Sequence, residues 1–354
     1  MRPFVYGTLP TRVVFGHGTL VCPAEEVHTL GCRRVMVLIG DEQRGRGEKL
    51  VAQLGNAAAG LSAGAVMHTP VAVTEQALAA VREAGADGLV ALGGGSAIGL
   101  GKAIALRTDL PQIAIPTTYA DSEATPVLGQ TEGERKTTQR TRKVLPEVIL
   151  YGVALTLTLP VPISTTSGLN AMAHAVEALY ATDGNPATAN LAEQGITALA
   201  QALPRIVAQP GDLAFRSDAL LGGWACGTCL GTAGMGLHHR LCHVHGGSFG
   251  LPHAATHAVV LPHVAAFNAP AAAEAMAIVA RALGSADAPC GLFDLASRLG
   301  VPRSLREIGM LAHRSSSRTG AARAARSEPL QLPALHRTDR PFSSSSTAMS
   351  SIPR

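Results

Sequence analysis

A strand, a glycine-rich turn and a helix follow one another between residues 87 and 107, and this succession restricts the fold more than any other feature of the chain. Three consecutive glycines stand at positions 93–95, between an apolar run and a segment whose apolar side chains have helical spacing. Strands that turn directly into helices build parallel sheets with helices on both faces. The same alternation recurs between residues 34 and 115. We therefore expect residues 1–160 to form an α/β domain with a doubly wound, mainly parallel sheet.

The second half of the chain has no strand signals. Four of its segments are rich in Ala and Leu and have apolar side chains at helical spacing: residues 167–182, 186–203, 218–245 and 271–283. We expect residues 161–310 to form an all-α catalytic domain, with the cleft between the two domains as the default ligand site. At the start of the chain, residues 4–6 and 12–15 predict an opening hairpin.

The composition excludes several classes of protein. Hydrophobic residues make up 47% of the chain and charged residues 15%, so a large core can form and global disorder is excluded. No uncharged apolar run reaches about 18 residues, and the N-terminus lacks the apolar region of a secretion signal. The six cysteines have no framework spacing. Cys226 and Cys229 form a CxxC pair, but the apolar sequence around them indicates core packing. We therefore expect a cytoplasmic protein with no membrane partner.

The last 44 residues carry the positive charge of the chain. Residues 311–354 contain seven Arg, no Lys and two acids, so the other 310 residues have a net charge of −1. A nearly neutral body does not favour nucleic acid as a partner. The tail also contains ten Ser and shows no apolar period, which is typical of disorder.

The glycine-rich turn is a candidate phosphate-binding site. Gly93, Gly94 and Gly95 let the backbone approach a ligand closely, and the N–H groups at the start of the next helix would face an anion. Ser96 can cap that helix and donate to a phosphate. Asp41 follows an earlier strand and can either accept a hydrogen bond from an adenosine ribose or cap a helix. We expect a dinucleotide-binding domain, although the GxGxxG fingerprint is absent.

Histidines gather between residues 236 and 253, where five of the 13 in the chain lie. His239 and His243 are four residues apart and share one helix face, and Asn170 and His174 have the same spacing. An Asp-x-x-x-His helix with two further histidines would bind a divalent metal. Here a neutral and weak ligand, Asn, holds the first position. A single histidine is more often a hydrogen-bonded core residue than a ligand, but the clustering favours a functional site.

Several ordered motifs over residues 2–309 resemble the iron-containing alcohol dehydrogenase superfamily, whose fold is shared with dehydroquinate synthase. They are the GGGS turn, the sequence PTTYADSEATP at 116–126, LTLTLP at 155–160 and the spacing His239-x3-His243-x9-His253. Further segments are similar to the maleylacetate reductases within that superfamily: residues 167–180, 237–243 and 251–257. The resemblance stops near Met310, so a frameshift at that point is an alternative origin of the tail.

The resemblance has consequences for the metal. In metal-dependent members, the positions of Asn170, His174, His239 and His253 hold Asp and three His. The maleylacetate reductases resemble this chain in carrying Asn there and working without a metal, so we expect no metal. His245 stands where the family has an aliphatic residue, and it would either restore metal affinity or lie in the helix end.

The resemblance also implies an activity, the NAD(P)H-dependent reduction of the C=C bond of 2-maleylacetate to 3-oxoadipate in the degradation of aromatic compounds. The cofactor would be NADH, with NADPH as a second option, and it would lie on the glycine-rich turn, with Thr117 and Thr118 nearby. His243 would donate the proton, and His253 and His239 would position or polarise the substrate. Asn170 and His174 would bind a carboxylate or enolate oxygen.

Two other enzymatic interpretations stay open. A metal-dependent alcohol dehydrogenase would use His174, His239 and His253 as ligands, and a lyase of the dehydroquinate synthase type would need an acidic ligand that the chain lacks. We expect a small dicarboxylate as substrate and a homodimer as the assembly.

Overall fold

The computed structural model describes residues 3–19, 23–133 and 135–310, which belong to one compact unit of the chain. The predictions for the tail, residues 311–354, fall outside the described residues. The strands end at Gly152 and the long helices of the second half begin at Val161. A division into two domains at residue 160 stays a prediction.

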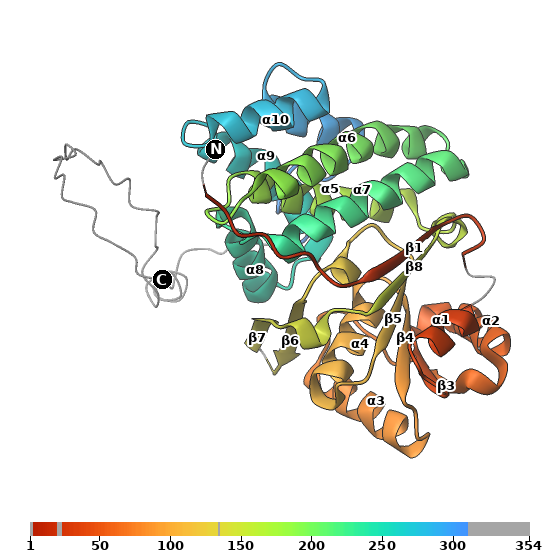
Figure 1. Cartoon of the computed structure of the whole chain (residues 1–354). Coiled ribbons are helices and arrows are strands. Elements are labelled where there is room, and N and C mark those ends of the chain that lie inside the picture. Colours follow the sequence, from red (N-terminus) through yellow and green to blue (C-terminus); the bar gives the residue numbers. More distant parts are fainter. Residues whose placement is uncertain (1–2, 20–22, 134, 311–354) are drawn as a thin grey trace, which may run out of the picture. The chain divides into compact units, whose positions relative to one another are not determined.

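Six strands form one sheet, in which every neighbouring pair is parallel (Figure 1). In the order of the sheet they are β1 (Arg12–Gly16), β8 (Val148–Gly152), β5 (Gln112–Pro116), β4 (Gly88–Gly93), β2 (Val35–Leu38) and β3 (Ala58–Ser62). The four central strands are buried along their whole length, as parallel strands covered on both faces should be. The predicted parallel α/β fold is confirmed.

Alternate residues of the central strands enter two different cores. Val35 and Val37 of β2 pack in one hydrophobic cluster with residues of α1 and α2, whereas Met36 and Leu38 join another with residues of α3 and α4. Successive side chains of a strand point to opposite faces, so one apolar run serves both layers of helices. These helices are α1 (Pro23–Thr29), α2 (Arg44–Leu54), α3 (Val71–Glu83) and α4 (Gly95–Thr108).

The predicted opening hairpin is wrong. Residues 4–6 form no strand, and β1 pairs in parallel with β8 at the edge of the sheet. The partner of β1 lies far along the chain, so the local pattern of residues 4–15 could not reveal it. One antiparallel hairpin does occur elsewhere, between β6 (Val127–Glu132) and β7 (Arg135–Arg140).

The second half is helical, as predicted, and α5 packs mainly against α6, α7 and α9 (Figure 1). The helices are α5 (Val161–Leu179), α6 (Pro186–Ala208), α7 (Leu213–Thr232), α8 (Leu237–Phe249), α9 (His253–Asn268), α10 (Ala273–Leu283) and α11 (Ala288–Arg298). Among the described residues, no helix has both the length and the apolar character needed to cross a membrane.

One predicted helix, residues 218–245, is in fact two helices. The break lies at residues 233–236, where Gly234 and Gly236 interrupt the helical pattern. Glu177 of α5 stabilises the new helix start, because its carboxylate accepts hydrogen bonds from the backbone N–H groups of Gly236, His238 and His239 at 3.1, 2.9 and 3.3 Å. A carboxylate at a helix N-terminus satisfies unpaired N–H groups and matches the helix dipole.

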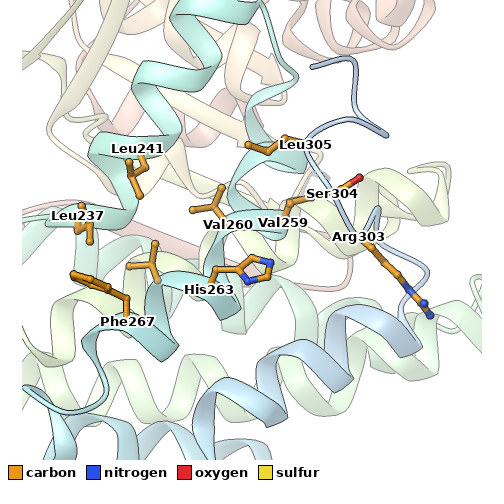
Figure 2. Close-up of a pocket in the computed structure, with 10 residues that line it drawn as sticks. Leu237, Leu241, Val259, Val260, His263, Phe267, Arg303, Ser304 and Leu305 are labelled. Carbon is orange, nitrogen blue, oxygen red and sulfur yellow. The ribbon is translucent and has the colours of Figure 1, made fainter. Parts of the chain in front are cut away.

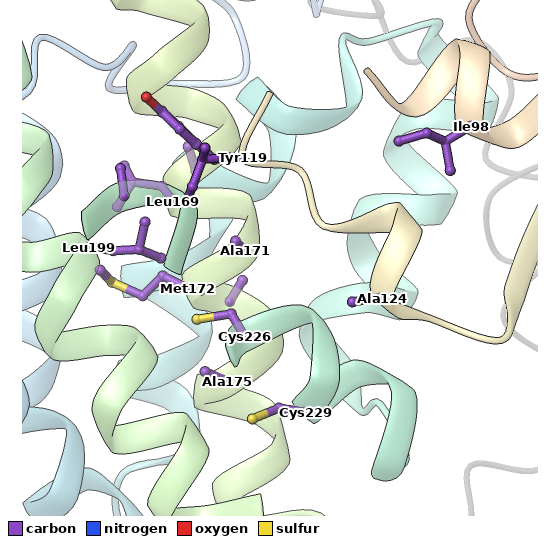
Figure 3. Close-up of a cluster of buried hydrophobic side chains, with 14 of the residues drawn as sticks. Ile98, Tyr119, Ala124, Leu169, Ala171, Met172, Ala175, Leu199, Cys226 and Cys229 are labelled. Atoms are coloured by element: carbon purple, nitrogen blue, oxygen red, sulfur yellow. The ribbon is translucent and has the colours of Figure 1, made fainter. Parts of the chain in front are cut away.

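The CxxC pair lies in the hydrophobic core, as predicted. Cys226 and Cys229 of α7 are fully buried beside Ala171 and Ala175 of α5 (Figure 3). A Cβ atom built on Gly195 of α6 would lie 2.6 Å from Sγ of Cys226, so α6 and α7 approach closely only because that residue is glycine.

Candidate active site

The carboxyl ends of β2, β4 and β5 lie side by side at one edge of the sheet. The chain leaves β2 toward β3 on one side and returns to β4 on the other, so the strand order reverses between β2 and β4. Ligands of doubly wound sheets bind at such switch points. Asp41 follows β2, the GGGS turn follows β4, and Thr117 and Thr118 follow β5. The fold brings all the residues that we predicted for cofactor binding to this edge.

The three glycines of the turn lie in different local environments. Gly93 has φ +151°, a conformation that other residues rarely adopt, and its carbonyl accepts a hydrogen bond from the N–H of Thr117 at 3.0 Å. A Cβ on Gly94 would lie 2.9 Å from Cγ2 of Thr118, whereas a Cβ on Gly95 would meet no atom within 4 Å. The space beside Gly95 at the start of α4 is therefore open, as an anion site at a helix N-terminus requires.

Two details of the prediction at this edge are wrong. Helix α4 begins at Gly95 with Gly94 as its N-cap, so Ser96 lies inside the helix and does not cap it. Asp41 caps no helix either, because Gly40 holds that position and Asp41 forms an exposed ion pair with Arg44 at 2.6 Å. In both cases a glycine takes the extended cap conformation, one residue before Asp41 and two residues before Ser96.

Three helices bring three histidines together. His174 of α5, His239 of α8 and His257 of α9 each place one ring nitrogen within 4.8 Å of the others. The ring centroid of His239 lies 4.8 Å from that of His174 and 4.9 Å from that of His257. All three side chains are buried. The sequence singled out His174 and His239 but missed His257, although its position one helical turn after His253 was a usable signal.

Each of these three rings is held through its Nδ1 atom. Asp121 Oδ2 lies 2.7 Å from Nδ1 of His174, Glu177 Oε2 lies 2.5 Å from Nδ1 of His239, and Nε2 of His238 lies 3.1 Å from Nδ1 of His257. Sequence reasoning assigned no role to Asp121, Glu177 or His238. Partners of this kind fix the orientation of an imidazole and leave its Nε2 atom for a ligand.

The electrostatics keep the histidines of this cluster neutral. Burial lowers the pKa of His174 to about 4 and that of His238 to about 3, and it lowers the pKa of His239 and His257 as well. Burial alone would raise the pKa of Glu177, but its hydrogen bond and charge interaction with His239, together with those with His238, lower it to about 2.

The remaining residues that we predicted for the site are His243 and His253, which are partly exposed, and Asn170, which is buried. His243 and His253 are partly exposed, with ring centroids 6.0 Å apart, and the ring of His253 lies 4.3 Å from that of His257. Asn170 is buried one turn before His174, and its Oδ1 atom has no hydrogen-bond partner among the described residues. The structure therefore joins Asn170, His174, His239, His253 and His243 into one region.

His245 belongs to a different environment. Its ring packs against Phe249, with centroids 6.1 Å apart, and it is in neither of the two potential metal-ligand groups of the described residues. Of the two roles that we considered for His245, the structure supports the position in the helix end.

A loop connects the nucleotide edge with the histidines. Thr117 and Thr118 begin this loop, and Asp121 follows three residues later. Lys102 of α4 is fully buried and donates to the carbonyls of Thr125 and Val127 at 2.8 and 2.9 Å, which anchors the far end of the loop. Hydrogen bonds thus connect the loop that carries Asp121 both to the glycine-rich turn, through Thr117 and Gly93, and to α4, through Lys102.

An apolar cavity of about 540 Å³ is lined by residues of α8, of α9 and of positions 303–305, and by none of the clustered histidines (Figure 2). Leu237, Leu241, Val264 and Phe267 line it, with few polar groups. It has no set of converging titratable groups, so we assign the chemistry to the histidines.

Comparison with known proteins agrees with this geometry. Residues 10–152 match the family model described as iron-containing alcohol dehydrogenase, and residues 164–334 match the model of the C-terminal part of the Fe-containing alcohol dehydrogenase family. The chain belongs to the iron-containing alcohol dehydrogenase family, and it is an oxidoreductase.

Within this family the chain is similar to maleylacetate reductases. It is 56% identical to the maleylacetate reductase of Rhizobium sp. (strain MTP-10005) over 310 residues, which are 88% of each chain. It is 52% identical to that of Sphingobium indicum over 307 residues, 87% of each chain. The crystal structure of the maleylacetate reductase from Agrobacterium tumefaciens superimposes with a TM-score of 0.86 at 55% identity, covering 88% of this chain and 89% of that one. The resemblance read from the sequence is confirmed.

Neither the comparisons nor the structure supports the prediction that the chain needs no metal. The family is named for iron, and three buried imidazoles converge in this structure. Imidazole nitrogens with hydrogen-bonded partners behind them suit a divalent transition metal. The residues present therefore fit such an ion, even though Asn170 replaces the expected acid.

Proposed function

We propose that this enzyme reduces the C=C bond of maleylacetate with NADH, or with NADPH, and forms 3-oxoadipate. The observation that carries the proposal is the similarity to maleylacetate reductases over seven-eighths of the chain. The chemistry of the site supports it, because two partly exposed histidines, His243 and His253, lie beside the buried histidine cluster.

The cofactor would bind at the switch point of the sheet. Its pyrophosphate would lie on Gly93, Gly94, Gly95 and Ser96, at the N-terminus of α4, where helices bind anions. Thr117 and Thr118 would flank it from β5, and the ribose hydroxyls would donate hydrogen bonds to the carboxylate of Asp41. The loop from Thr118 to Asp121 would then hold the nicotinamide side of the site next to the histidines.

In the reaction, hydride would leave the nicotinamide and attack the alkene carbon that is β to the ketone. Electrons of the C=C bond then move toward the ketone oxygen and form an enolate, which takes one proton at its α-carbon. We propose that His243 donates this proton, because its side chain is more accessible than the buried histidines and because an ordinary imidazole has a pKa near neutrality. His253 would position the substrate beside it.

The buried residues would contact only the inner end of the substrate. Asn170, His174 and His239 are 2%, 4% and 7% exposed, so a single oxygen atom or ion can reach them, but a whole substrate cannot. We propose that they hold the carboxylate or enolate oxygen. A divalent metal bound by the histidines would supply Lewis-acid stabilisation of the negative oxygen.

The test is a nicotinamide oxidation assay with maleylacetate, combined with mass spectrometry of the product. We expect one NADH consumed for each 3-oxoadipate formed. If maleylacetate caused oxidation of neither NADH nor NADPH, in protein that binds the nucleotide, the proposal would be contradicted. Size-exclusion chromatography with light scattering would test the homodimer that we also propose.

A second candidate is a metal-dependent alcohol dehydrogenase, and the convergence of His174, His239 and His257 favours it. Such an enzyme would oxidise simple primary alcohols with NAD and would lose all activity on chelation. Turnover of alcohols without turnover of maleylacetate would select this alternative.

A further inference from the structure

We propose that Arg216 of α7 is a positioning residue for the nucleotide edge and that it acts through the hydroxyl of Tyr119. Tyr119 directly follows Thr117 and Thr118, the two threonines that we propose for cofactor binding. The inference rests on that part of the proposed function, but it does not depend on the substrate. Binding of NADH therefore tests it separately from reduction of maleylacetate.

The first argument is the state of the Arg216 side chain, which is fully buried. Its guanidinium donates to the carbonyls of Pro210 and Leu159 at 2.9 and 3.2 Å. The Nη1 atom donates to the hydroxyls of Ser164 and Tyr119 at 2.7 and 3.1 Å. All four of these acceptors are uncharged oxygens. A buried charge is costly even when it is hydrogen-bonded, and an apolar side chain of similar volume often fills such a space without loss of stability. The structural reason for a cation here is therefore that it joins four separate groups.

The second argument is which parts of the chain these groups belong to. Three of the four acceptors lie near the start of α5 or of α7, in the helical half of the chain. Only Tyr119 belongs to the loop that connects the nucleotide edge with the histidines. Its hydroxyl also forms a hydrogen bond with the side chain of Thr156, so it is held from two sides. Arg216 thus ties this loop to the helices.

The third argument is the close contact between the loop and α7. Gly223 and Gly227 are one helical turn apart and share a face of α7. A Cβ atom on Gly223 would lie 3.2 Å from the carbonyl oxygen of Tyr119, and one on Gly227 would lie 2.6 Å from Cβ of Asp121. Close packing therefore holds Asp121, independently of the guanidinium. Loss of the Tyr119 hydroxyl should disturb the first part of the loop and leave Asp121 in place.

The first part of the loop contacts the glycine-rich turn. The N–H of Thr117 donates to the carbonyl of Gly93 at 3.0 Å, and a Cβ atom on Gly94 would lie 2.9 Å from Cγ2 of Thr118. Because Thr118 and Tyr119 are neighbours in the chain, a shift of the tyrosine changes these contacts directly. We therefore expect the contact between Tyr119 and the guanidinium to control how well the nucleotide edge binds its cofactor.

The test compares two variants that each remove one hydroxyl from the same nitrogen of Arg216. Tyr119→Phe removes the acceptor on the loop, and Ser164→Ala, the matched control, removes the acceptor on α5. In fluorescence titrations of full-length protein, Tyr119→Phe should bind NADH about tenfold more weakly, which corresponds to about 1.4 kcal/mol. Ser164→Ala should leave the dissociation constant within about twofold. Both variants should lower the melting temperature by similar amounts, because each leaves the guanidinium short of one acceptor.

Two further measurements separate positioning from a general loss of structure. In Tyr119→Phe the KM for NADH should rise with the dissociation constant, while kcat at saturating NADH stays within about threefold of the wild type. Arg216→Lys retains the charge but lacks the planar fork that reaches several acceptors. It should also weaken NADH binding, and combining it with Tyr119→Phe should cause no further weakening, because both changes remove the same contact.

Three results would overturn the inference. They are wild-type NADH affinity in Tyr119→Phe, equal weakening in Tyr119→Phe and Ser164→Ala, and additive effects in the double variant. Tyr119→Phe keeps the buried ring and should fold, so the comparison with Ser164→Ala remains decisive even where Arg216→Lys does not fold. Wild-type protein that binds NADH without reducing maleylacetate would overturn the proposed function and leave this inference intact. Wild-type protein that binds no nicotinamide nucleotide would overturn both.

Discussion

The carboxylate of Asp121 lies 2.7 Å from Nδ1 of His174, although 53 positions separate the two residues in the chain. Both side chains are almost completely buried. Asp121 also has φ +57°, a left-handed conformation that is unfavourable for a residue with a side chain. Such local strain concentrates at functional sites, where the surrounding structure maintains it.

We predict that Asp121 is a positioning residue for His174. Asp121→Gly removes the carboxylate and suits the positive φ, so the variant should fold while kcat falls about 10–100-fold and KM for NADH changes little. Asp109 is a matched control, since it has φ +61° but is exposed, and Asp109→Gly should leave kcat unchanged. Steady-state kinetics on both variants test this role of Asp121. If the kcat of Asp121→Gly equalled that of the wild type, Asp121 would have only a structural role.

The second prediction concerns Glu177 and pH. Its pKa is lowered to about 2 in the folded chain from the ordinary value of 4.5. A depressed carboxyl pKa contributes stability above the unfolded pKa, and this contribution is lost as the pH falls from about 4.5 toward 2. We expect the stability advantage of the wild type over Glu177→Gln, measured by urea unfolding, to shrink over that window.

Glu193 provides the control for this experiment. It pairs with Arg281 on the surface, and its pKa is also lowered, but solvent screens the pair. Glu193→Gln should therefore change the urea midpoint little at any pH. An advantage over Glu177→Gln that stays constant from pH 5 to pH 2 would show that the charge of Glu177 does not stabilise the start of α8.

The third prediction concerns the proton donor. His243→Ala should lower kcat for maleylacetate by about 10²–10⁴, the usual contribution of a general acid, while the dissociation constant of NADH changes little. His245→Ala is a nearby control on the same helix, outside the histidine cluster, and should stay close to wild type. Near-normal kcat in His243→Ala would remove this residue from the mechanism.

The fourth prediction concerns the glycine-rich turn. Gly95→Ala places a methyl group in open space at the start of α4, so the melting temperature should not fall. The same methyl group would occupy the position of a bound phosphate, and we expect NADH to bind about tenfold more weakly, which corresponds to about 1.4 kcal/mol. Gly211→Ala, also without a neighbour within 4 Å, is the control. Unchanged NADH affinity in Gly95→Ala, measured by fluorescence titration, would argue against phosphates at this helix start.

The fifth prediction concerns the cysteines. Burial raises the pKa of the Cys226 thiol well above its usual value and that of Cys229 to about 12, whereas Cys290 is exposed. The experiment uses a Cys22→Ser variant, so that Cys22 does not contribute to the labelling. In this variant a thiol reagent should modify Cys290 within minutes and leave the CxxC pair unmodified until the protein unfolds. Rapid labelling of Cys226 or Cys229 in the native state would contradict the assignment of this pair to the core.

Local patterns in the sequence were enough for the parts of the fold that depend on neighbours in the chain. The strand before Gly93, the turn at the three glycines and the helix after them were all predicted, because each of these elements depends on residues within about ten positions. The same holds for the spacing of Asn170 with His174 and of His239 with His243, since one helical turn brings them together. Errors arose where a distant partner decides, as for β1, whose neighbour β8 lies at the other end of the α/β segment.

The sequence by itself determined the fold class, the glycine-rich turn and which short segments carry the histidines. Only the tertiary structure decided that Asp121 contacts His174, that Glu177 contacts both His239 and the start of α8, and that His257 completes the cluster. The physical reason is that these contacts are made across packed helices and a long loop, between residues 53 and 62 positions apart. Helical and strand periods report which face of an element is buried, but they contain no information about which buried group meets which.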